Sequence, residues 1–375
     1  MLFPPCHSMA VSSLPTSRSA IVCISETPGA NLAVRHGLPM PLPLAPGHVL
    51  VHVVAVALNP CNWKMPDRFP SIGSVGGSDF AGSIVALSDG IETTHPGLTV
   101  GDRVCGAVHG FNPADHKSGS FSNYIVATAD ILLKIPEGVR WEEAAAIGGT
   151  GIATLGIAFR QYLLPESWFV NQAKVDETLP VLVYGAGTAT GTIAIQLLRI
   201  LGFRPLAVCS SKSAQLALSY GAEKTFDYTS STCAADIKSY TNRRLAHVLD
   251  IIADSTSIKL CYDAMGRLGG SYVGLELLPD DRPNRQLVHA AWVMGQSIFG
   301  KALQLGRGYG IPASPASRQL GKRWFAEVQE LWHRGAIKPH PVRVGQQRGL
   351  EAVIDGVNIM RRRQVAREKL VYFLQ

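Results

Sequence analysis

The 375-residue sequence lacks the patterns that identify membrane, secreted and repetitive proteins. Its best candidate for a membrane span, residues 49–58, contains His52 and is far shorter than the roughly 20 apolar residues that a spanning helix needs. Residues 1–19 have no apolar segment after a basic start, so we expect a flexible tail there rather than a signal peptide. Internal repeats and low-complexity segments are also missing. These absences favour an ordinary globular protein.

Cysteine is present, but not in a pattern that would hold a metal ion or a disulfide framework. The seven cysteines are widely spaced, no Cys-x-x-Cys pair occurs, and their number is odd. Structural zinc sites and disulfide-stabilised domains both need closely spaced or paired cysteines. We therefore expect free thiols and a cytoplasmic location, because reduced thiols are the rule in the cytosol.

Charged residues are scarce, at 17 % of the sequence, whereas hydrophobic residues make up 46 %. This composition excludes a disordered chain, which needs low hydrophobicity and high charge. The net charge is +7, but the basic residues are dispersed and zinc-finger spacing is absent, so nucleic acid is disfavoured as a partner. The densest basic run is 361–363, with Arg367 close behind. A solvated helix face or a docking patch for an acidic partner would account for this run.

Two patterns follow each other along the chain and predict an α/β fold. Short β-branched runs such as 49–56, separated by Gly and Pro turns, are typical of a small β-barrel. From about residue 141, strand-sized apolar runs alternate with helix-sized segments, which indicates a doubly wound parallel sheet. We therefore predict a tail at 1–19, a barrel-type domain at 20–170 completed by 310–375, and a nucleotide-binding domain at 171–309.

The most informative motif is a glycine pattern between an apolar strand and an amphipathic helix. Strand 180–184 leads into Gly185, Gly187 and Gly191, and the helix follows at once. In a dinucleotide-binding fold the first glycine allows the turn, the second lets the backbone approach a pyrophosphate, and the third lets the helix pack on the strand. The helix N-terminus then offers free N–H groups to the anion. A purely structural turn is the alternative.

Acidic residues are missing where an NAD-binding domain would need one. Asp and Glu are absent from Gly191 through Ala222, a stretch that includes the end of the second expected strand of the sheet. An acid there binds the ribose 2′-hydroxyl of NAD, whereas hydroxyls and a lysine bind a 2′-phosphate. Residues 210–213 read Ser-Ser-Lys-Ser, so we predict NADPH as the cofactor. The alternative is that Lys212 is only a solvated residue at a helix start.

Four further segments, 59–64, 77–82, 101–104 and 119–121, make the sequence resemble the medium-chain dehydrogenase/reductase family. Segments 272–276, 297–300 and 368–372 are similar to a subgroup of that family, the fungal trans-acting enoyl reductases, which serve polyketide synthases without a working reductase domain. The resemblance covers residues 20–375 and implies a GroES-like β-barrel-type domain beside a doubly wound parallel-sheet Rossmann domain.

The resemblance also implies which residues bind the cofactor. They are Cys61, Asn62, Trp63, Lys64, Gly187, Thr188, Ala189, Thr190, Ser210, Ser211, Lys212, Ser213, Tyr228, Leu275, Glu276, Val365 and Ala366. Of these, the resemblance places 61–64, 275–276 and 365–366 near the nicotinamide, 187–190 near the pyrophosphate, and the rest on the adenosine side. Trp63 and Tyr228 could instead serve only packing.

Two places depart from the pattern of the subgroup. Cys61-Asn62 stands where Thr-Asp is more usual, and Ala366-Arg367 stands where Ser-Gly is more usual. Side-chain contacts with the cofactor could be lost at both places while backbone contacts survive.

The implied substrate-binding residues form two short segments. They are Thr150, Gly151, Ile152, Ala153, Thr154, Leu155, Gly156, Ile157, Gln296, Ser297, Ile298, Phe299 and Gly300. The small residues at 148–151 would either leave room for an acyl chain or only allow close packing.

A catalytic zinc ion is not expected. Zinc alcohol dehydrogenases of this family resemble one another in a Gly-His-Glu segment where this sequence reads Gly77-Ser78-Asp79, and the four-cysteine lobe is missing. His95, His109 and His116 lie in polar loops, so we expect all three at the surface.

The resemblance implies an NADPH-dependent enoyl reductase acting on an α,β-unsaturated acyl thioester. The thioester would be carried by a partner polyketide synthase, alone or fused to a nonribosomal peptide synthetase, and docked through Arg361, Arg362, Arg363 and Arg367. Lys64 is the first candidate for a catalytic role, with a salt-bridged surface lysine as the alternative, and bulk water could supply the proton. A free-standing quinone or enal reductase and an NADP-binding scaffold without turnover stay open. We expect a monomer that binds neither nucleic acid nor a membrane.

Overall fold

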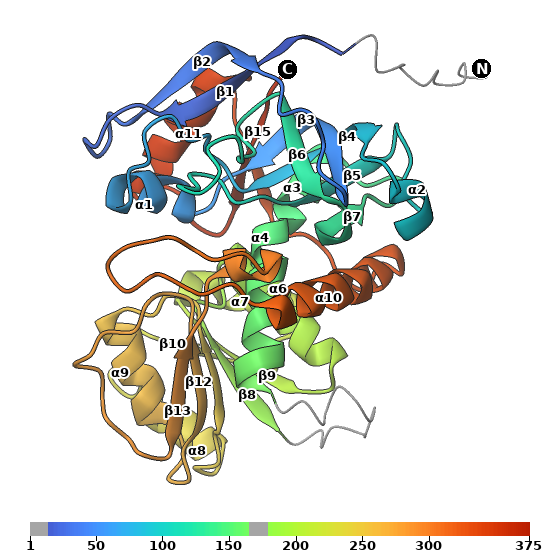
Figure 1. Cartoon of the computed structure of the whole chain (residues 1–375). Coiled ribbons are helices and arrows are strands. Elements are labelled where there is room, and N and C mark those ends of the chain that lie inside the picture. Colours follow the sequence, from blue (N-terminus) through green and yellow to red (C-terminus); the bar gives the residue numbers. More distant parts are fainter. Residues whose placement is uncertain (1–13, 165–178) are drawn as a thin grey trace.

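The computed structural model describes residues 14–164 and 179–375 and arranges them in two lobes (Figure 1). The upper lobe combines the first and last parts of the chain, and the lower lobe is built from the middle. Strand β1 (Ser17–Cys23) already contains residues 17–19, so the prediction of a flexible tail is wrong for these positions. The predicted boundary between 170 and 171 lies outside the described residues and stays a prediction.

The upper lobe is a barrel-like sheet around an apolar core. Its strand order is β14-β15-β3-β4-β5-β7, β6 pairs with β3, and β1 forms a separate antiparallel pair with β2. Strand β3 (His48–Ala57) is central, and seven of its ten residues, mostly valine and alanine, are buried. The remaining strands are β2 (Leu32–Pro39), β4 (Asp79–Leu87), β5 (Arg103–Ala107), β6 (Tyr124–Thr128), β7 (Leu132–Lys134), β14 (Val342–Val344) and β15 (Lys369–Phe373).

The end of the chain completes this lobe. Strand β15 runs antiparallel to β3, with Val371 opposite Ala57, and β14 runs parallel to β15. The helices of the lobe are α1 (Cys61–Arg68), α2 (Ile91–Thr94), the 3₁₀ helix η2 (Ala129–Ile131), α3 (Trp141–Ile147) and α11 (Leu350–Arg361).

The lower lobe is a six-stranded parallel sheet in the order β10-β9-β8-β11-β12-β13. This order is that of a doubly wound dinucleotide-binding fold, so the predicted fold class is confirmed. The strands are β8 (Pro180–Tyr184), β9 (Arg204–Cys209), β10 (Lys224–Asp227), β11 (His247–Asp250), β12 (Gly270–Gly274) and β13 (Val288–Trp292). The helices around them are α6 (Ala189–Ile200), α7 (Ser211–Ser219), α8 (Cys233–Tyr240) and α9 (Ser255–Ala264).

The two lobes share one hydrophobic core. Helix α4 (Gly149–Ile157), continued by a π-helical segment, η3 (Ala158–Leu163), packs against α10 (Pro315–His333) and the 3₁₀ helix η4 (Gly295–Phe299). The core around α4 contains Ala57 of the barrel sheet and Val183 of the parallel sheet. This shared core holds the end of strand β8 close to α4.

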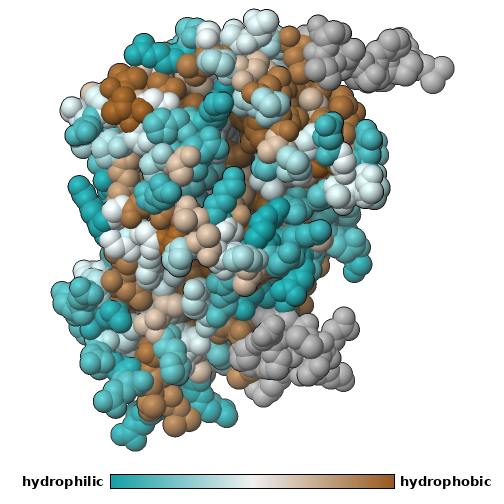
Figure 2. All heavy atoms as spheres, viewed as in Figure 1, coloured by the Kyte–Doolittle hydropathy of each residue, from teal (hydrophilic) through white to brown (hydrophobic). Residues whose placement is uncertain are grey.

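Hydrophilic side chains cover much of the visible face of both lobes (Figure 2). Within residues 14–164 and 179–375, every helix is too short or too polar to cross a membrane.

Candidate active site

The glycine loop joins strand β8 to helix α6 through a turn that only glycine adopts easily. Gly185 has a φ of 81°, and a Cβ atom at Gly191 would lie 2.5 Å from the Gly185 carbonyl oxygen. The Thr188 hydroxyl accepts a hydrogen bond from the Gly191 N–H (3.1 Å) and donates one to the Gly185 oxygen (2.8 Å). This hydroxyl is therefore engaged within the loop, and the N–H groups of Ala189 and Thr190 at the start of α6 remain for an anion.

The loops that follow β8 and β9 lie side by side. A Cβ atom at Gly187 would lie 2.6 Å from the Cβ of Ser213, and the Ser210 and Ser213 hydroxyl oxygens are 3.2 Å apart. Lys212 is exposed in the first turn of α7. Four residues that the sequence predicted for one cofactor are thus brought together.

An acid that sequence reasoning missed stands beside this loop. The Asp227 carboxylate accepts a hydrogen bond from the Ser211 N–H at 3.1 Å. Hydrogen bonds from the Thr229 N–H and hydroxyl, with the one from Ser211, lower the pKa of Asp227, so it is ionised at neutral pH. The acid-free stretch reaches only to Ala222, whereas β10 pairs with β9, so Asp227 at the end of β10 lies beside Cys209 at the end of β9.

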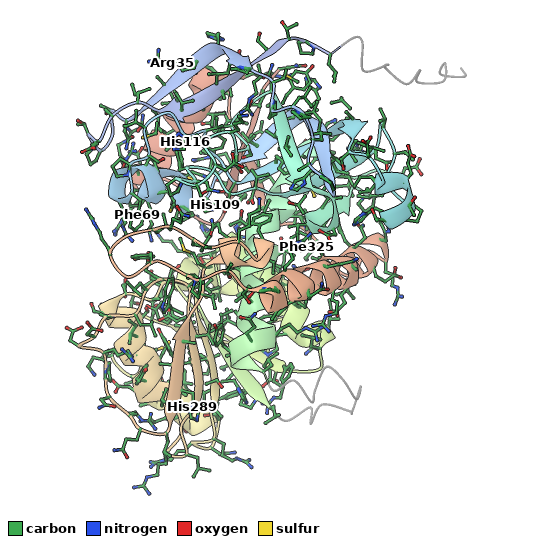
Figure 3. The ribbon with its side chains drawn as sticks, viewed as in Figure 1. Arg35, Phe69, His109, His116, His289 and Phe325 are labelled. Carbon is green, nitrogen blue, oxygen red and sulfur yellow. The ribbon has the colours of Figure 1, made fainter. Side chains whose placement is uncertain are left out.

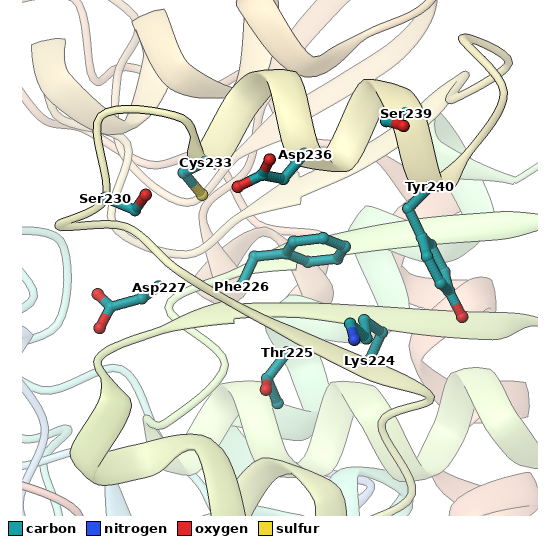
Figure 4. Close-up of a pocket in the computed structure, with 9 residues that line it drawn as sticks. All are labelled: Lys224, Thr225, Phe226, Asp227, Ser230, Cys233, Asp236, Ser239 and Tyr240. Carbon is teal, nitrogen blue, oxygen red and sulfur yellow. The ribbon is translucent and has the colours of Figure 1, made fainter.

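Pockets lie on both sides of strand β10. One, of about 240 Å³, is lined by Cys209, Ser210, Ser211, Ala214, Thr225, Phe226 and Asp227. The other, of about 550 Å³, lies between β10 and α8 (Figure 4) and is lined by Lys224, Thr225, Phe226, Asp227, Ser230, Cys233, Asp236, Ser239 and Tyr240. Tyr228, which is 44 % exposed, follows β10, and its ring centre lies 6.0 Å from that of Tyr184. Its position at the carboxyl ends of β8 and β10 suits the adenosine side of a cofactor.

Lys64 forms an ion pair that joins the two lobes. Its Nζ lies 2.9 Å from Glu276 Oε2, and Arg68 approaches the same oxygen at 3.2 Å. The Tyr309 hydroxyl donates to the other Glu276 oxygen. Burial alone would raise the pKa of Glu276, but hydrogen bonds from Tyr309 and Lys64 outweigh it and lower the pKa. Two predicted cofactor residues from different lobes, Lys64 and Glu276, therefore meet as a salt bridge.

The residues just before Lys64 point into the barrel lobe. Asn62 is buried, accepts a hydrogen bond from the Asn59 N–H (2.7 Å) and donates one to the Ser78 hydroxyl (3.2 Å). Cys61 Sγ lies 3.5 Å from the same hydroxyl, and burial raises the pKa of its thiol. The Trp63 ring packs against the barrel core. These three side chains position helix α1, and their predicted cofactor contacts stay predictions.

A buried ion pair occupies the segment where zinc-dependent relatives are expected to bind their metal. Asp79 is fully buried, and its carboxylate lies 3.1 Å from Lys369 Nζ. It also accepts hydrogen bonds from Asn59 Nδ2 (2.7 Å) and from the Thr150 N–H (2.8 Å). The described residues contain no group of three or more His, Cys, Asp or Glu arranged to hold a metal ion. Asp79 therefore ties β4 to β15 and to the start of α4.

His109 corrects one sequence prediction. It is only 8 % exposed, on the side of the upper lobe that faces the lower lobe (Figure 3), and its Nε2 is buried without a hydrogen-bond partner among the described residues. Burial lowers the pKa of His109 to about 4. His95 is partly buried and His116 is exposed, so the surface prediction is confirmed for His116 and wrong for His109. The loop around His109 is polar in sequence, but other parts of the chain pack against this side chain and bury it.

The predicted substrate segments lie against each other at the lobe junction. A Cβ atom at Gly295 would lie 2.4 Å from the Thr154 hydroxyl, so η4 and α4 are in close contact. A Cβ atom at Gly151 would lie 3.7 Å from the Thr190 hydroxyl, at the first turn of the cofactor helix α6. The Thr150 hydroxyl between them is buried and has no partner among the described residues. Gly151, next to Thr150, thus brings the start of α4 to the first turn of α6, beside the glycine loop.

Most other side chains of these segments belong to the core. Members with 0–2 % exposure are Ile152, Ala153, Leu155, Ile157 and Ile298. Trp324 occupies the space that a side chain at Gly156 would need and donates a hydrogen bond to the Ile152 oxygen at 2.8 Å. The absence of a side chain at Gly156 therefore serves close packing. At 148–149 the same holds, because a Cβ atom at Gly149 would lie 2.2 Å from the Ala107 nitrogen.

The side chain of Arg367, in the segment before β15, reaches the loop after β9. Arg367, next to Ala366, donates a hydrogen bond from NH1 to the Lys212 oxygen at 3.4 Å. This contact places the Arg367 guanidinium beside 210–213, and the predicted contacts of Val365 and Ala366 with the nicotinamide stay predictions. Val365 packs against the barrel core.

One member of the predicted docking patch has a structural role. Arg361 forms two hydrogen bonds of 2.9 Å to the Asp67 carboxylate, which joins α11 to α1. Arg362 and Arg363 are exposed at the end of α11. The docking patch predicted from the sequence is therefore reduced to these two residues, with Arg367 turned toward Lys212.

Comparison with known proteins decides the family. Two family models match, the alcohol dehydrogenase GroES-like domain at residues 45–137 and the zinc-binding dehydrogenase model at residues 189–302. Trans-enoyl reductase ffsC of Aspergillus flavipes is 44 % identical over 98 % of each chain. Trans-enoyl reductase pyiC of Pyricularia grisea is 46 % identical over 96 % of this chain and 95 % of its own. The chain belongs to the trans-enoyl reductase family.

Solved structures share the fold of this trans-enoyl reductase family member. An alcohol dehydrogenase superfamily protein from Novosphingobium aromaticivorans has a TM-score of 0.74 at 19 % identity and covers 96 % of this chain and 100 % of its own. The quinone oxidoreductase of Escherichia coli, solved with NADPH, has a TM-score of 0.68 at 17 % identity over 95 % and 99 % of the two chains. These structures show the fold, and the relatives named as enoyl reductases together with the matched dehydrogenase model make the chain an oxidoreductase with a nicotinamide-binding lobe.

The residues of the glycine loop fit a nicotinamide cofactor. The left-handed turn at Gly185 and the capped start of α6 provide the N–H groups that hold a pyrophosphate. Sequence reasoning missed Asp227, which accepts from the Ser211 N–H, and Tyr309 and Arg68, which both contact Glu276. The family resemblance of residues 59–64 was the one sequence signal that predicted a role for α1 at the site. Nothing in the sequence predicted that Tyr309 would contact Glu276.

Proposed function

We propose that this protein is a trans-acting enoyl reductase that uses NADPH to reduce the α,β-double bond of an acyl thioester. The thioester is carried by a separate polyketide synthase, either alone or fused to a nonribosomal peptide synthetase. The observation that carries the proposal is the meeting of the cofactor loop with the predicted substrate helix at Gly151 and Thr190. An acyl chain lying beside α4 would reach the cofactor there.

The choice of NADPH rests on the loop after β9. The hydroxyls of Ser210 and Ser213 lie 3.2 Å apart, and Lys212 adds a positive charge in the same turn. Hydroxyl and ammonium groups bind a 2′-phosphate, which carries a charge that an adjacent carboxylate would repel. Asp227 opposes this preference in part, because its carboxylate lies at the same turn.

The protein mainly positions the two reactants. The bound cofactor supplies the hydride for the double bond. The Lys64–Glu276 pair fixes α1 against the loop after β12 and so holds the two lobes around the site. The Thr150 hydroxyl, buried without a described partner, donates a hydrogen bond to the thioester oxygen as negative charge develops there. Water supplies the proton at the α-carbon.

The proposed cell compartment and partner follow from thiols and charge. The six cysteines among the described residues are free thiols, which fits a reducing cytoplasm. The net charge of +7 suits an acidic carrier domain, and the exposed Arg362 and Arg363 would contribute to its docking. We expect the protein to act as a monomer.

A comparison of small substrates tests the reaction. Purified protein and NADPH are mixed with a short unsaturated acyl thioester or with a quinone, and NADPH oxidation is followed by absorbance. We expect turnover of the thioester to exceed that of the quinone. Faster turnover of the quinone would favour a free-standing quinone reductase, and inertness toward both would favour an NADP-binding scaffold. Thr150→Val keeps the shape of the side chain and should lower kcat more than it changes KM, because the hydroxyl acts mainly in the transition state.

A further inference from the structure

Arg367 has a backbone conformation that arginine rarely adopts. Its φ is 61°, in the left-handed region that favours glycine, and the resemblance to the subgroup implies glycine at this position. An arginine at such a place costs backbone strain, and strain of this kind is retained where the surrounding structure uses it. Other arginines, such as Arg243 and Arg363, also have a positive φ, so the contacts of the Arg367 side chain decide whether it has a role.

The side chain of Arg367 crosses from the upper lobe to the lower lobe. It follows helix α11 and precedes strand β15, whereas its NH1 donates to the Lys212 oxygen in the first turn of α7. Its guanidinium forms an ion pair with no carboxylate among the described residues. A single exposed hydrogen bond of 3.4 Å leaves most of its five N–H donors available.

The charge of the loop at 210–213 depends on Arg367. Lys212 contributes one positive charge, and the Asp227 carboxylate, 3.1 Å from the Ser211 nitrogen, contributes one negative charge. These two charges balance, so on their own they give a 2′-phosphate little net attraction. Arg367 makes the net charge of the three side chains positive, and its guanidinium can bind two phosphate oxygens at once.

We infer that Arg367 is a specificity-determining residue that binds the 2′-phosphate of NADPH from the opposite lobe. The inference rests on the proposed use of NADPH and adds a residue outside the predicted cofactor set. On binding, the guanidinium exchanges the Lys212 oxygen for phosphate oxygens. The 2′-phosphate is then held by α7 of the lower lobe and by the segment before β15 of the upper lobe.

Calorimetric titration of four ligands tests the inference without any turnover. The ligands are NADPH, NADH, 2′,5′-ADP and 5′-AMP, of which the last two lack the nicotinamide. Arg367→Gly should weaken NADPH and 2′,5′-ADP about tenfold, or about 1.4 kcal/mol, and should change NADH and 5′-AMP less than twofold. Arg367→Lys should restore part of the loss, because one ammonium replaces the bidentate guanidinium.

Arg243→Gly is the matched control. Arg243 is also an exposed arginine with a positive φ, 58°, but it lies between α8 and the start of β11, at the amino ends of the parallel strands, whereas residues 210–213 follow the carboxyl end of β9. Its replacement removes the same charge and the same strain, and it should leave all four dissociation constants unchanged. An equal loss for Arg243→Gly would show an effect of net charge alone and would overturn the inference.

The remaining outcomes separate this inference from the proposed function. Unchanged NADPH affinity in Arg367→Gly, or an equal loss for NADPH and NADH, would overturn the role of Arg367 while the NADPH preference of the unmodified protein stands. Equal binding of NADPH and NADH by the unmodified protein would overturn the NADPH preference and the inference together. The reduction of an enoyl thioester is measured separately and would be unaffected by either result.

Discussion

At the scale of single residues, the proposed preference for NADPH depends on charges that follow or end two neighbouring strands, β9 and β10. Lys212 stands in the first turn of α7, shortly after β9, and Asp227 stands at the end of β10. The sequence placed the first at the cofactor because the glycine pattern fixes where β9 must end. It could not place the second, because only the pairing of β10 with β9 brings Asp227 to the Ser211 nitrogen.

Lys212→Glu should remove the preference for NADPH. We expect the unmodified protein to bind NADPH at least tenfold more tightly than NADH, which is about 1.4 kcal/mol. The variant adds a second carboxylate beside Asp227 and should bind both cofactors equally or prefer NADH. Fluorescence titration measures both dissociation constants, and Lys322→Glu, an exposed site on α10, serves as the control. A retained tenfold preference in Lys212→Glu would contradict this assignment.

His109 should make the free energy of unfolding depend on pH. Burial lowers the pKa of His109 to about 4, whereas in the unfolded chain the ring is protonated below about 6.5. The unfolded state therefore binds more protons between those values, so stability falls as the pH drops from 6.5 toward 4 and is unaffected above that window. Between pH 7 and pH 5 the loss should be about 2 kcal/mol for this one ring.

Urea denaturation at the two pH values measures this dependence. In His109→Gln the loss between pH 7 and pH 5 should shrink, but not vanish, because burial also lowers the pKa of His340 to about 4. The comparison uses the change with pH and not the stability at one pH, so a cost of the substitution itself does not affect it. The same loss in the variant and in the unmodified protein would mean that His109 is accessible to protons when folded.

At the scale of elements, the strand–turn–helix unit around the glycine loop could be predicted best. Strand β8, the turn at Gly185 and helix α6 follow one another in the sequence, so local patterns suffice to place them. His109 and Arg367 could not be placed, because their surroundings come from segments far away in the chain. The polar loop around His109 gave no sign of burial, and the arginine run gave no sign that Arg367 reaches α7.

Gly191→Ala should loosen the contact of α6 with β8. Its Cβ would lie 2.5 Å from the Gly185 oxygen and 2.8 Å from the Ala186 Cα, so the helix start must move. Such overpacking costs about 1–3 kcal/mol and should also weaken NADPH and NADH by similar factors. Urea denaturation and cofactor titration measure the two effects. Gly97→Ala, where the space around the Cβ is open, should change neither, and an unaltered Gly191→Ala would contradict this account of the turn.

At the scale of the whole molecule, the proposed docking of a separate, carrier-bound substrate uses the exposed Arg362 and Arg363. Charge reversal at Arg362 and Arg363 should lower kcat/KM for a carrier-bound enoyl chain and hardly change it for a small thioester. Such attraction acts on encounter and is screened over a Debye length of about 8 Å at physiological salt, so the difference should shrink at high salt.

Arg361→Glu is the contrasting variant in the docking experiment. It breaks the bidentate pair with Asp67, so it should lower stability and turnover of both substrates. An equal loss on both substrates for the Arg362 and Arg363 variant would show that these residues support the fold, and docking through them would be abandoned.

The most direct test of the account is the reduction of a chain on its carrier. A carrier domain loaded with an α,β-unsaturated acyl thioester is incubated with the protein and NADPH, and its intact mass is measured. The account predicts a gain equal to two hydrogen atoms, with deuterium appearing in the acyl chain when the transferred hydride of NADPH is labelled. An unchanged mass, with NADPH bound but not oxidised, would contradict the claim that this protein is an enoyl reductase.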